Sequence, residues 1–158
     1  MSQHMSEYTF GVATPSQIHG KTGLEIMRAM QHHELPAPPI AKTLNFWLVA
    51  ADEGTVTFEG ETSFDLLNPL GIVHGGWALA LLDTVTGCAA HTTLGIGETY
   101  TSVECKGNFS RPIPHDLGKV RAVGQVITRG KKIITAEGKI FSMENKILAH
   151  GTATLIIL

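Results

Sequence analysis

The fold of this chain is decided by one stretch, Asn68-Pro69-Leu70-Gly71-Ile72-Val73-His74-Gly75-Gly76-Trp77-Ala78-Leu79-Ala80-Leu81-Leu82-Asp83. Its first part is a loop by its Asn, Pro and Gly residues. The apolar run that follows predicts a long helix over residues 75–93, roughly 27 Å long at 1.5 Å per residue. We expect Asp83 to lie inside this buried helix, where an unpaired carboxylate is costly and therefore needs a reason to be kept.

The rest of the pattern is mostly strands, which short links join and which we therefore expect to be antiparallel neighbours. A helix that is apolar almost all round needs cover on all sides. An antiparallel sheet curled around it, with a second subunit completing the burial, is the simplest α+β arrangement. The predicted strands span residues 44–50, 55–59, 99–110, 119–128, 131–143 and 146–158.

Composition excludes several classes of protein. The 158 residues fit one ordinary domain, and a net charge of −2 leaves no broad basic surface for nucleic acid. No run reaches the ~18 apolar residues of a membrane span, and the N-terminus lacks the features of a secretory signal. Cys88 and Cys105 are too few for a disulfide scaffold, so we expect two reduced thiols in a cytoplasmic protein.

Residues 1–39 are interpreted as an N-terminal arm and residues 40–158 as the main domain. The first 20 residues are expected to be loosely held. Residues 22–30 predict a short amphipathic helix, capped by Thr22 with Glu25 three positions later. The prolines at positions 36, 38 and 39 are expected to end any helix there.

Asp83 shares its helix face with mostly small residues, including Gly87. A glycine within a helix costs about 1 kcal/mol relative to alanine, so Gly87 indicates that a partner helix or a ligand approaches closely. Two interpretations stay open: Asp83 is a reactive carboxylate, or it bonds to a neighbouring chain in a tight helix contact.

The predicted helix begins at Gly75 and Gly76, where free backbone N–H groups can receive a developing oxyanion. A plain tight turn is the alternative. His74 is either a hydrogen-bond donor near the reacting centre or a structural clamp on the loop. No histidine spacing suggests a metal site, and no nucleophile elbow or phosphate-binding glycine loop is present.

One cationic turn stands apart from this stretch. The residues Arg129, Gly130 and Lys131, followed by Lys132, form a predicted hairpin turn. It could bind the phosphates of a nucleotide-containing ligand, or it could be a solvated turn without a ligand.

Together these motifs resemble the hotdog-fold acyl-CoA thioesterases, nearest to the phenylacetate-degradation and 4-hydroxybenzoyl-CoA branch. The resemblance covers about residues 40–158. It rests on the stretch from Asn68 to Gly76 with Asp83 nine positions after His74. It is extended by Ser102-x-Glu104-x-Lys106-x-Asn108-Phe109-x-Arg111-Pro112 and by Arg129-Gly130-Lys131.

The resemblance implies an α+β hotdog fold and a role for each matched residue. Asp83 would be the catalytic carboxylate, either as nucleophile on the thioester or as base for water. The Gly75 N–H would polarise the carbonyl, with Asn68 and His74 supporting it from the same loop. Ser102 would orient water or substrate beside the carboxylate. The coenzyme A nucleotide would be held by Arg129, Gly130 and Lys131.

The resemblance also implies a homo-oligomer, either a dimer or a dimer of dimers, with sites between subunits and neither metal nor cofactor. The function it implies is hydrolysis of an aryl- or medium-chain acyl-CoA to free acid and coenzyme A. A non-catalytic acyl-CoA binding or sensing protein is the alternative, and a hotdog hydratase is a third possibility. Some relatives carry a threonine where this chain has Gly87, which leaves the nucleophile and base roles of Asp83 both open.

Overall fold

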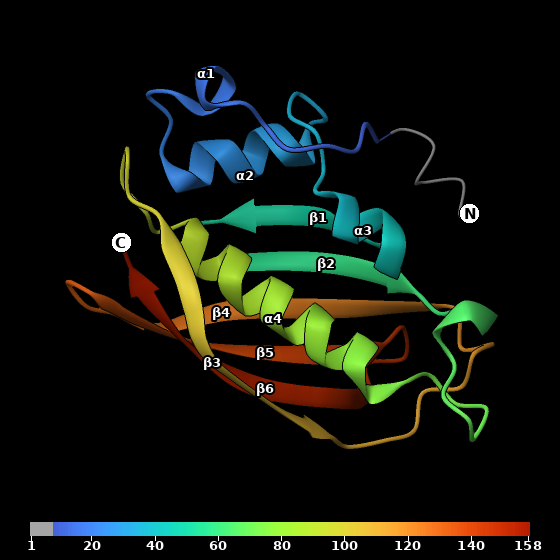
Figure 1. Cartoon of the computed structure of the whole chain (residues 1–158). Coiled ribbons are helices and arrows are strands. Elements are labelled where there is room, and N and C mark those ends of the chain that lie inside the picture. Colours follow the sequence, from blue (N-terminus) through green and yellow to red (C-terminus); the bar gives the residue numbers. More distant parts are fainter. Residues whose placement is uncertain (1–7) are drawn as a thin grey trace.

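A computed structural model describes residues 8–158. One six-stranded antiparallel sheet, ordered β1-β2-β4-β5-β6-β3, curls around the long helix α4 (Gly75–His91), which confirms the predicted α+β architecture (Figure 1). None of the helices in this described part is long and apolar enough to cross a membrane. The strands are β1 (Phe46–Asp52), β2 (Thr55–Glu61), β3 (Tyr100–Phe109), β4 (Lys119–Arg129), β5 (Ile133–Ser142) and β6 (Ile147–Ile157).

The expectation that every short link joins neighbouring strands is wrong at β3. This strand pairs with β6 and forms one edge of the sheet, although β4 follows it in the chain. The connection carries Pro112 and Pro114, which have no N–H to donate in a hairpin. It pairs instead with the loop before α4, through Val73 N–H on the Ile113 carbonyl at 2.9 Å. The connection is therefore tied to the start of α4.

The N-terminal part is more ordered than its sequence indicates. The predicted short helix is α2 (Gly23–Gln31), with the expected capping box of Thr22 and Glu25. Two further helices, α1 (Pro15–Ile18) and α3 (Pro39–Leu44), and a 3-10 turn, η2 (Phe64–Leu66), were not predicted. The prolines do not end helical structure, because Pro39 begins α3, and proline suits the first helical position.

The expectation of a loosely held arm is also wrong where the structure describes it. Gly11 N–H donates to the Ala37 carbonyl, and Ala37 N–H donates to the Thr9 carbonyl, both at 2.9 Å. Residues 1–7 of the predicted arm lie outside the described residues. Helix α2 packs on β1, so the sheet edge formed by β1 is covered (Figure 1).

A row of glycines lets α4 lie close to the sheet. Gly124, Gly138, Gly151 and Gly107 are paired in register across β4, β5, β6 and β3. A methyl group on Gly124 would overlap the backbone carbonyl of Val85 in α4. One on Gly138 would meet only side-chain carbons of α4, at 3.1–3.2 Å.

This difference predicts graded effects of alanine on stability. We expect Gly124→Ala to lower the free energy of unfolding by about 3 kcal/mol, because the backbone of α4 must move, and Gly138→Ala by about 1 kcal/mol. Urea unfolding at one fixed protein concentration measures both. Equal losses in the two variants would contradict this account of helix packing.

Candidate active site

Asp83 is exposed in the single chain. The predicted burial of this carboxylate relies on a second subunit and so stays a prediction. The opposite side of α4 packs on the sheet, where Leu81, Leu82 and Val85 are fully buried. The apolar run suggested cover on every side, but one curled sheet covers only part of the helix. The carboxylate therefore lies on the face that the sheet leaves open.

Ser102 of β3 lies directly beside this carboxylate, as the sequence predicted. Its hydroxyl donates to Asp83 Oδ1 at 3.0 Å. A β-bulge makes this contact possible, because the pairing register shifts between Ser102 and Glu104. Beyond the bulge, Gly107 and Phe109 face α4. In a regular strand the side chains alternate between the two faces, so without the bulge Ser102 would point away from α4. The bulge reverses this and directs Ser102 toward the helix.

The close approach indicated by Gly87 comes from Tyr100 of the same chain, not from a partner helix or a ligand. A Cβ at Gly87 would lie 3.0 Å from the Tyr100 hydroxyl oxygen. Tyr100 and Ser102 are two positions apart on β3 and so share a face. This hydroxyl therefore fills the space beside Gly87, and sequence reasoning missed it.

Burial keeps two titratable groups near Asp83 neutral, the thiol of Cys88 and the phenol of Tyr100. It raises the pKa of the Cys88 thiol to about 12, with a further rise from the negative charge of Asp83. Burial is also the main cause that raises the pKa of Tyr100. Both cysteines are free thiols, as predicted. Because Cys88 stays a thiol at neutral pH, it is not an activated nucleophile.

At the start of α4, His74 acts as the helix cap. Its Nδ1 accepts the Gly76 N–H at 2.8 Å, which assigns the ring proton to Nε2. The imidazole therefore clamps the loop, one of its two predicted roles, and still has one N–H to donate. Within residues 8–158, nothing accepts the N–H of Gly75, and a Cβ on this glycine would lie 3.2 Å from the Phe109 ring.

Asn68 braces the same loop. Its Oδ1 accepts the Leu70 N–H at 2.9 Å, which leaves the side-chain NH₂ available. Asn68 and Gly75 line one cavity of about 300 Å³, whereas Asp83 and Ser102 line another of about 280 Å³. Gly75 and Asp83 are eight positions apart on α4, about 12 Å along its axis. Within one chain the predicted residues therefore form two groups, one at each cavity.

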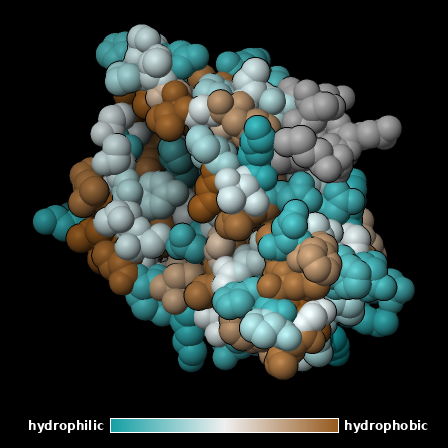
Figure 2. All heavy atoms as spheres, turned by 45° about the vertical axis from the view of Figure 1, so that its right-hand side comes forward, coloured by the Kyte–Doolittle hydropathy of each residue, from teal (hydrophilic) through white to brown (hydrophobic). Residues whose placement is uncertain are grey.

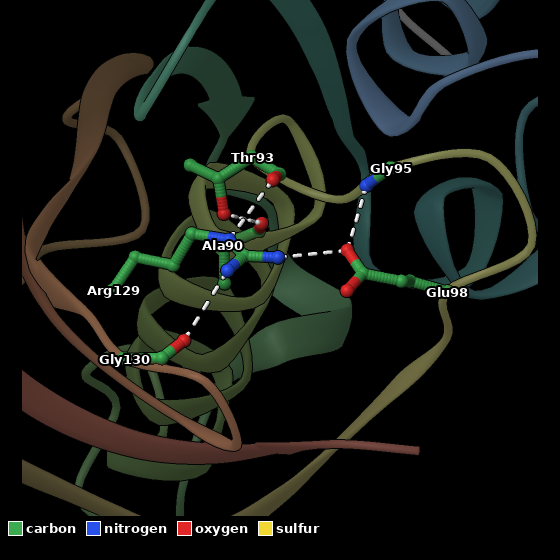
Figure 3. Close-up of polar contacts among 6 residues, drawn as sticks. All are labelled: Ala90, Thr93, Gly95, Glu98, Arg129 and Gly130. Atoms are coloured by element: carbon green, nitrogen blue, oxygen red, sulfur yellow. Dashed lines mark hydrogen bonds and ion pairs between the residues drawn. The ribbon is translucent and has the colours of Figure 1, made fainter.

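The cationic turn is a hairpin between β4 and β5, and Arg129 is engaged within the chain (Figure 3). Its guanidinium pairs with Glu98 at 2.7 Å and donates to the Thr93 carbonyl at 3.1 Å. It also donates to the carbonyl of Gly130 at 3.2 Å. Arg129 therefore ties the hairpin to the loop after α4, while Lys131 is exposed.

Glu98 is a site-supporting residue that sequence reasoning missed. Its carboxylate also accepts the Gly95 N–H at 2.7 Å. This bond, followed by the contact with Arg129, lowers the pKa of Glu98 below its ordinary value. No sequence motif marks the pair, because the two partners are 31 positions apart.

This pKa shift predicts a pH-dependent loop. The stabilisation that ionised Glu98 gives to the loop after α4 is fully present above its unfolded pKa of about 4.3. It is lost as pH falls through the lowered pKa of Glu98 in the folded protein. We expect the Gly95 amide to lose hydrogen-exchange protection over that range. Glu98→Ala should remove most of this protection at neutral pH, because it deletes the acceptor of the Gly95 N–H, whereas Glu144→Ala, which removes an exposed partner of Lys146, should not. Unchanged Gly95 protection in Glu98→Ala would contradict the assignment.

Comparison with known proteins shows the family of this chain and its fold. The thioesterase superfamily profile matches residues 70–149, just over half of the chain. A "Putative esterase" of Haemophilus influenzae is 30% identical over 92 residues, which is 58% of this chain and 65% of that curated relative. The chain therefore spans less than two thirds of the relative's length.

Two solved structures share the architecture at higher coverage. A phenylacetic acid degradation-related protein of Ralstonia eutropha JMP134 is 30% identical, with a TM-score of 0.75 over 82% of this chain and 98% of that one. A thioesterase of Haemophilus influenzae is 26% identical, with a TM-score of 0.70 over 75% of this chain and 82% of that one. The chain belongs to the thioesterase superfamily and has its hotdog fold.

Proposed function

We propose that this protein is an acyl-CoA thioesterase in which Asp83 is the catalytic carboxylate. The observation that carries the proposal is the hydrogen bond from Ser102 to Asp83 at an apolar cavity, in a chain of the thioesterase superfamily. Hydrolysis adds water across the thioester: the acyl carbon gains oxygen, the C–S bond breaks and the thiol leaves with a proton. A thioester is already activated, so the reaction needs no metal or cofactor.

The geometry around the carboxylate suits either of its two possible roles. Ser102 holds Oδ1 of Asp83, which fixes the side chain and leaves Oδ2 for the reaction. That oxygen can attack the thioester carbonyl, or it can take a proton from an attacking water.

We propose that the second half of each site comes from a partner subunit. The Gly75 N–H and the Asn68 amide would then receive the carbonyl oxygen that Asp83 of the other chain activates. Two observations support this pairing. The two halves lie in separate cavities of one chain, and the edge strand β3 is exposed along most of its length.

The open edge also exposes two large apolar side chains. Val103 and Phe109 of β3 are 58% and 57% exposed, and apolar side chains reach the surface in patches on the face drawn in Figure 2. An unprotected edge strand readily pairs with another chain. We therefore expect at least a dimer, and a dimer of dimers where further apolar surface is buried.

For the coenzyme A nucleotide, we propose the hairpin of Arg129, Gly130 and Lys131. Lys131 is exposed and can meet a phosphate as a point charge. Arg129 supports the hairpin through Glu98 and contributes positive charge. We expect the protein to work in the cytoplasm, where acyl-CoA and reduced cysteines coexist. A binding protein without catalysis remains the alternative, and release of free thiol distinguishes the two.

Replacing the carboxylate tests the central assignment. Asp83→Asn keeps the size of the side chain and its bond with Ser102 but removes the charge. We expect kcat to fall at least ~100-fold, the usual loss when a general base or nucleophile is removed, while affinity for coenzyme A stays near the parental value. Thiol release from hexanoyl- and phenylacetyl-CoA measures kcat, and calorimetry measures the affinity for coenzyme A. Ser102→Ala should lower kcat less, and a parental rate in Asp83→Asn would refute the role of Asp83.

Mixing two inactive variants tests the shared site. Asn68→Ala and Asp83→Asn damage opposite halves, so a mixed dimer would keep one intact site. After joint unfolding and refolding in equal amounts, we expect about a quarter of parental activity, because half of randomly formed dimers are mixed. Mixing Asp83→Asn with Ser102→Ala is the control, since both changes affect the same half. Activity no higher than the mean of the two separate variants would contradict a shared site.

A further inference from the structure

We infer that the N-terminal segment from Met27 to Ala41 is the selectivity wall of the acyl pocket, and that it limits the substrate to acyl groups of aryl or medium-chain size. The inference rests on the proposed thioesterase function and deepens it. The segment joins α2 to α3 and lies outside the residues matched by the superfamily profile, 70–149.

The cavity beside Asp83 is walled on one side by this segment. Met27 and Met30 come from α2, Pro38 from the link, and Ile40 and Ala41 from α3. Strand β1 and Phe58 of β2 add apolar walls, and α4 and β3 close the other side. Each subunit thus builds this pocket next to its own carboxylate.

The chemistry of the walls selects the acyl part of the substrate. Asp83 is the one acidic or basic side chain among the residues that line the cavity. The thiol of Cys88 and the phenol of Tyr100 stay neutral because burial raises the pKa of each. A coenzyme A phosphate would lose its hydration here without gaining a cation. An apolar acyl group has no such hydration to lose, and when it fills the cavity its thioester carbon lies at Asp83.

The volume sets the size of that group. About 280 Å³ is at the lower end of the ~300–1,000 Å³ that is usual for small-molecule pockets. A ring or a medium chain suits this space, and a long fatty chain needs more. The carboxylate at the pocket fixes one end of the acyl group, so the opposite wall determines the longest chain that fits.

This wall is anchored rather than mobile. Gly23 at the start of α2 donates its N–H to the Leu94 carbonyl at 3.0 Å and packs against the backbone of His91. Further along α2, Arg28 donates to the Ala51 carbonyl at 3.2 Å and pairs with Asp52 at 3.1 Å. Met27 is 1% exposed. A fixed wall can exclude a longer chain, whereas a mobile one would yield to it.

Two variants of opposite effect test the inference. Met30→Ala removes a half-buried side chain and should enlarge the pocket. Ile40→Trp adds bulk at a residue that is 53% exposed, so that folding is spared. The measured quantity is the ratio of kcat/KM for dodecanoyl-CoA to that for hexanoyl-CoA. Val12→Trp is the control, because Val12 is 83% exposed in the N-terminal part and does not line the cavity.

We expect Met30→Ala to raise the ratio about tenfold or more and Ile40→Trp to lower it, since each methylene in an apolar pocket changes selectivity about 10–200-fold. Val12→Trp should leave it unchanged. If the parent releases thiol and Asp83→Asn does not, but neither pocket variant changes the ratio, the wall is refuted and the thioesterase stands. If the parent releases no thiol, the proposed function itself fails.

Discussion

The close approach of α4 to the sheet is the constraint on which the rest of the structure depends. In the glycine row that is paired across four strands, Gly124, Gly138 and Gly107 add no side chain of the sheet where it faces α4. At Gly124 the backbone of the helix is so close that even a methyl group would overlap the Val85 carbonyl. A helix seated this tightly cannot rotate about its axis without exposing Leu81 or Leu82, both fully buried. Its orientation is therefore fixed, and with it the direction in which Asp83 points.

The site follows from that fixed orientation. The face of α4 that the sheet leaves open carries Asp83, and the edge strand β3 passes beside it. Because of the bulge after Ser102, side chains from both ends of β3 face the helix. The Ser102 hydroxyl reaches the carboxylate, and the Tyr100 hydroxyl fills the space beside Gly87. The reactive group is thus positioned by packing on one side and by a strand irregularity on the other.

In the proposed enzyme, the start and the middle of α4 divide the chemistry. The N-terminal end offers the free Gly75 N–H beside Asn68, and the middle offers the carboxylate, with separate cavities for each. One edge of the sheet is covered by α2 and the other is exposed. In the proposed dimer, antiparallel pairing of two subunits would bring unlike halves together. The N-terminal segment gives the cavity beside Asp83 an apolar wall, so in the proposed enzyme the acyl group would be recognised by the chain that supplies the carboxylate.

The sequence by itself determined the helix, its glycine start and the strand segments, and it marked Asp83 and His74 as candidates. The helix and the strands are local features, because turn residues, periodicity and capping depend on neighbouring positions. Asn68 and Ser102 became candidates only through the family resemblance. The place of β3 next to β6, the exposure of Asp83, and the contact of Tyr100 with Gly87 were decided only by the tertiary structure. Each depends on which distant segments meet, and pairing across many residues leaves no periodic signal along the chain.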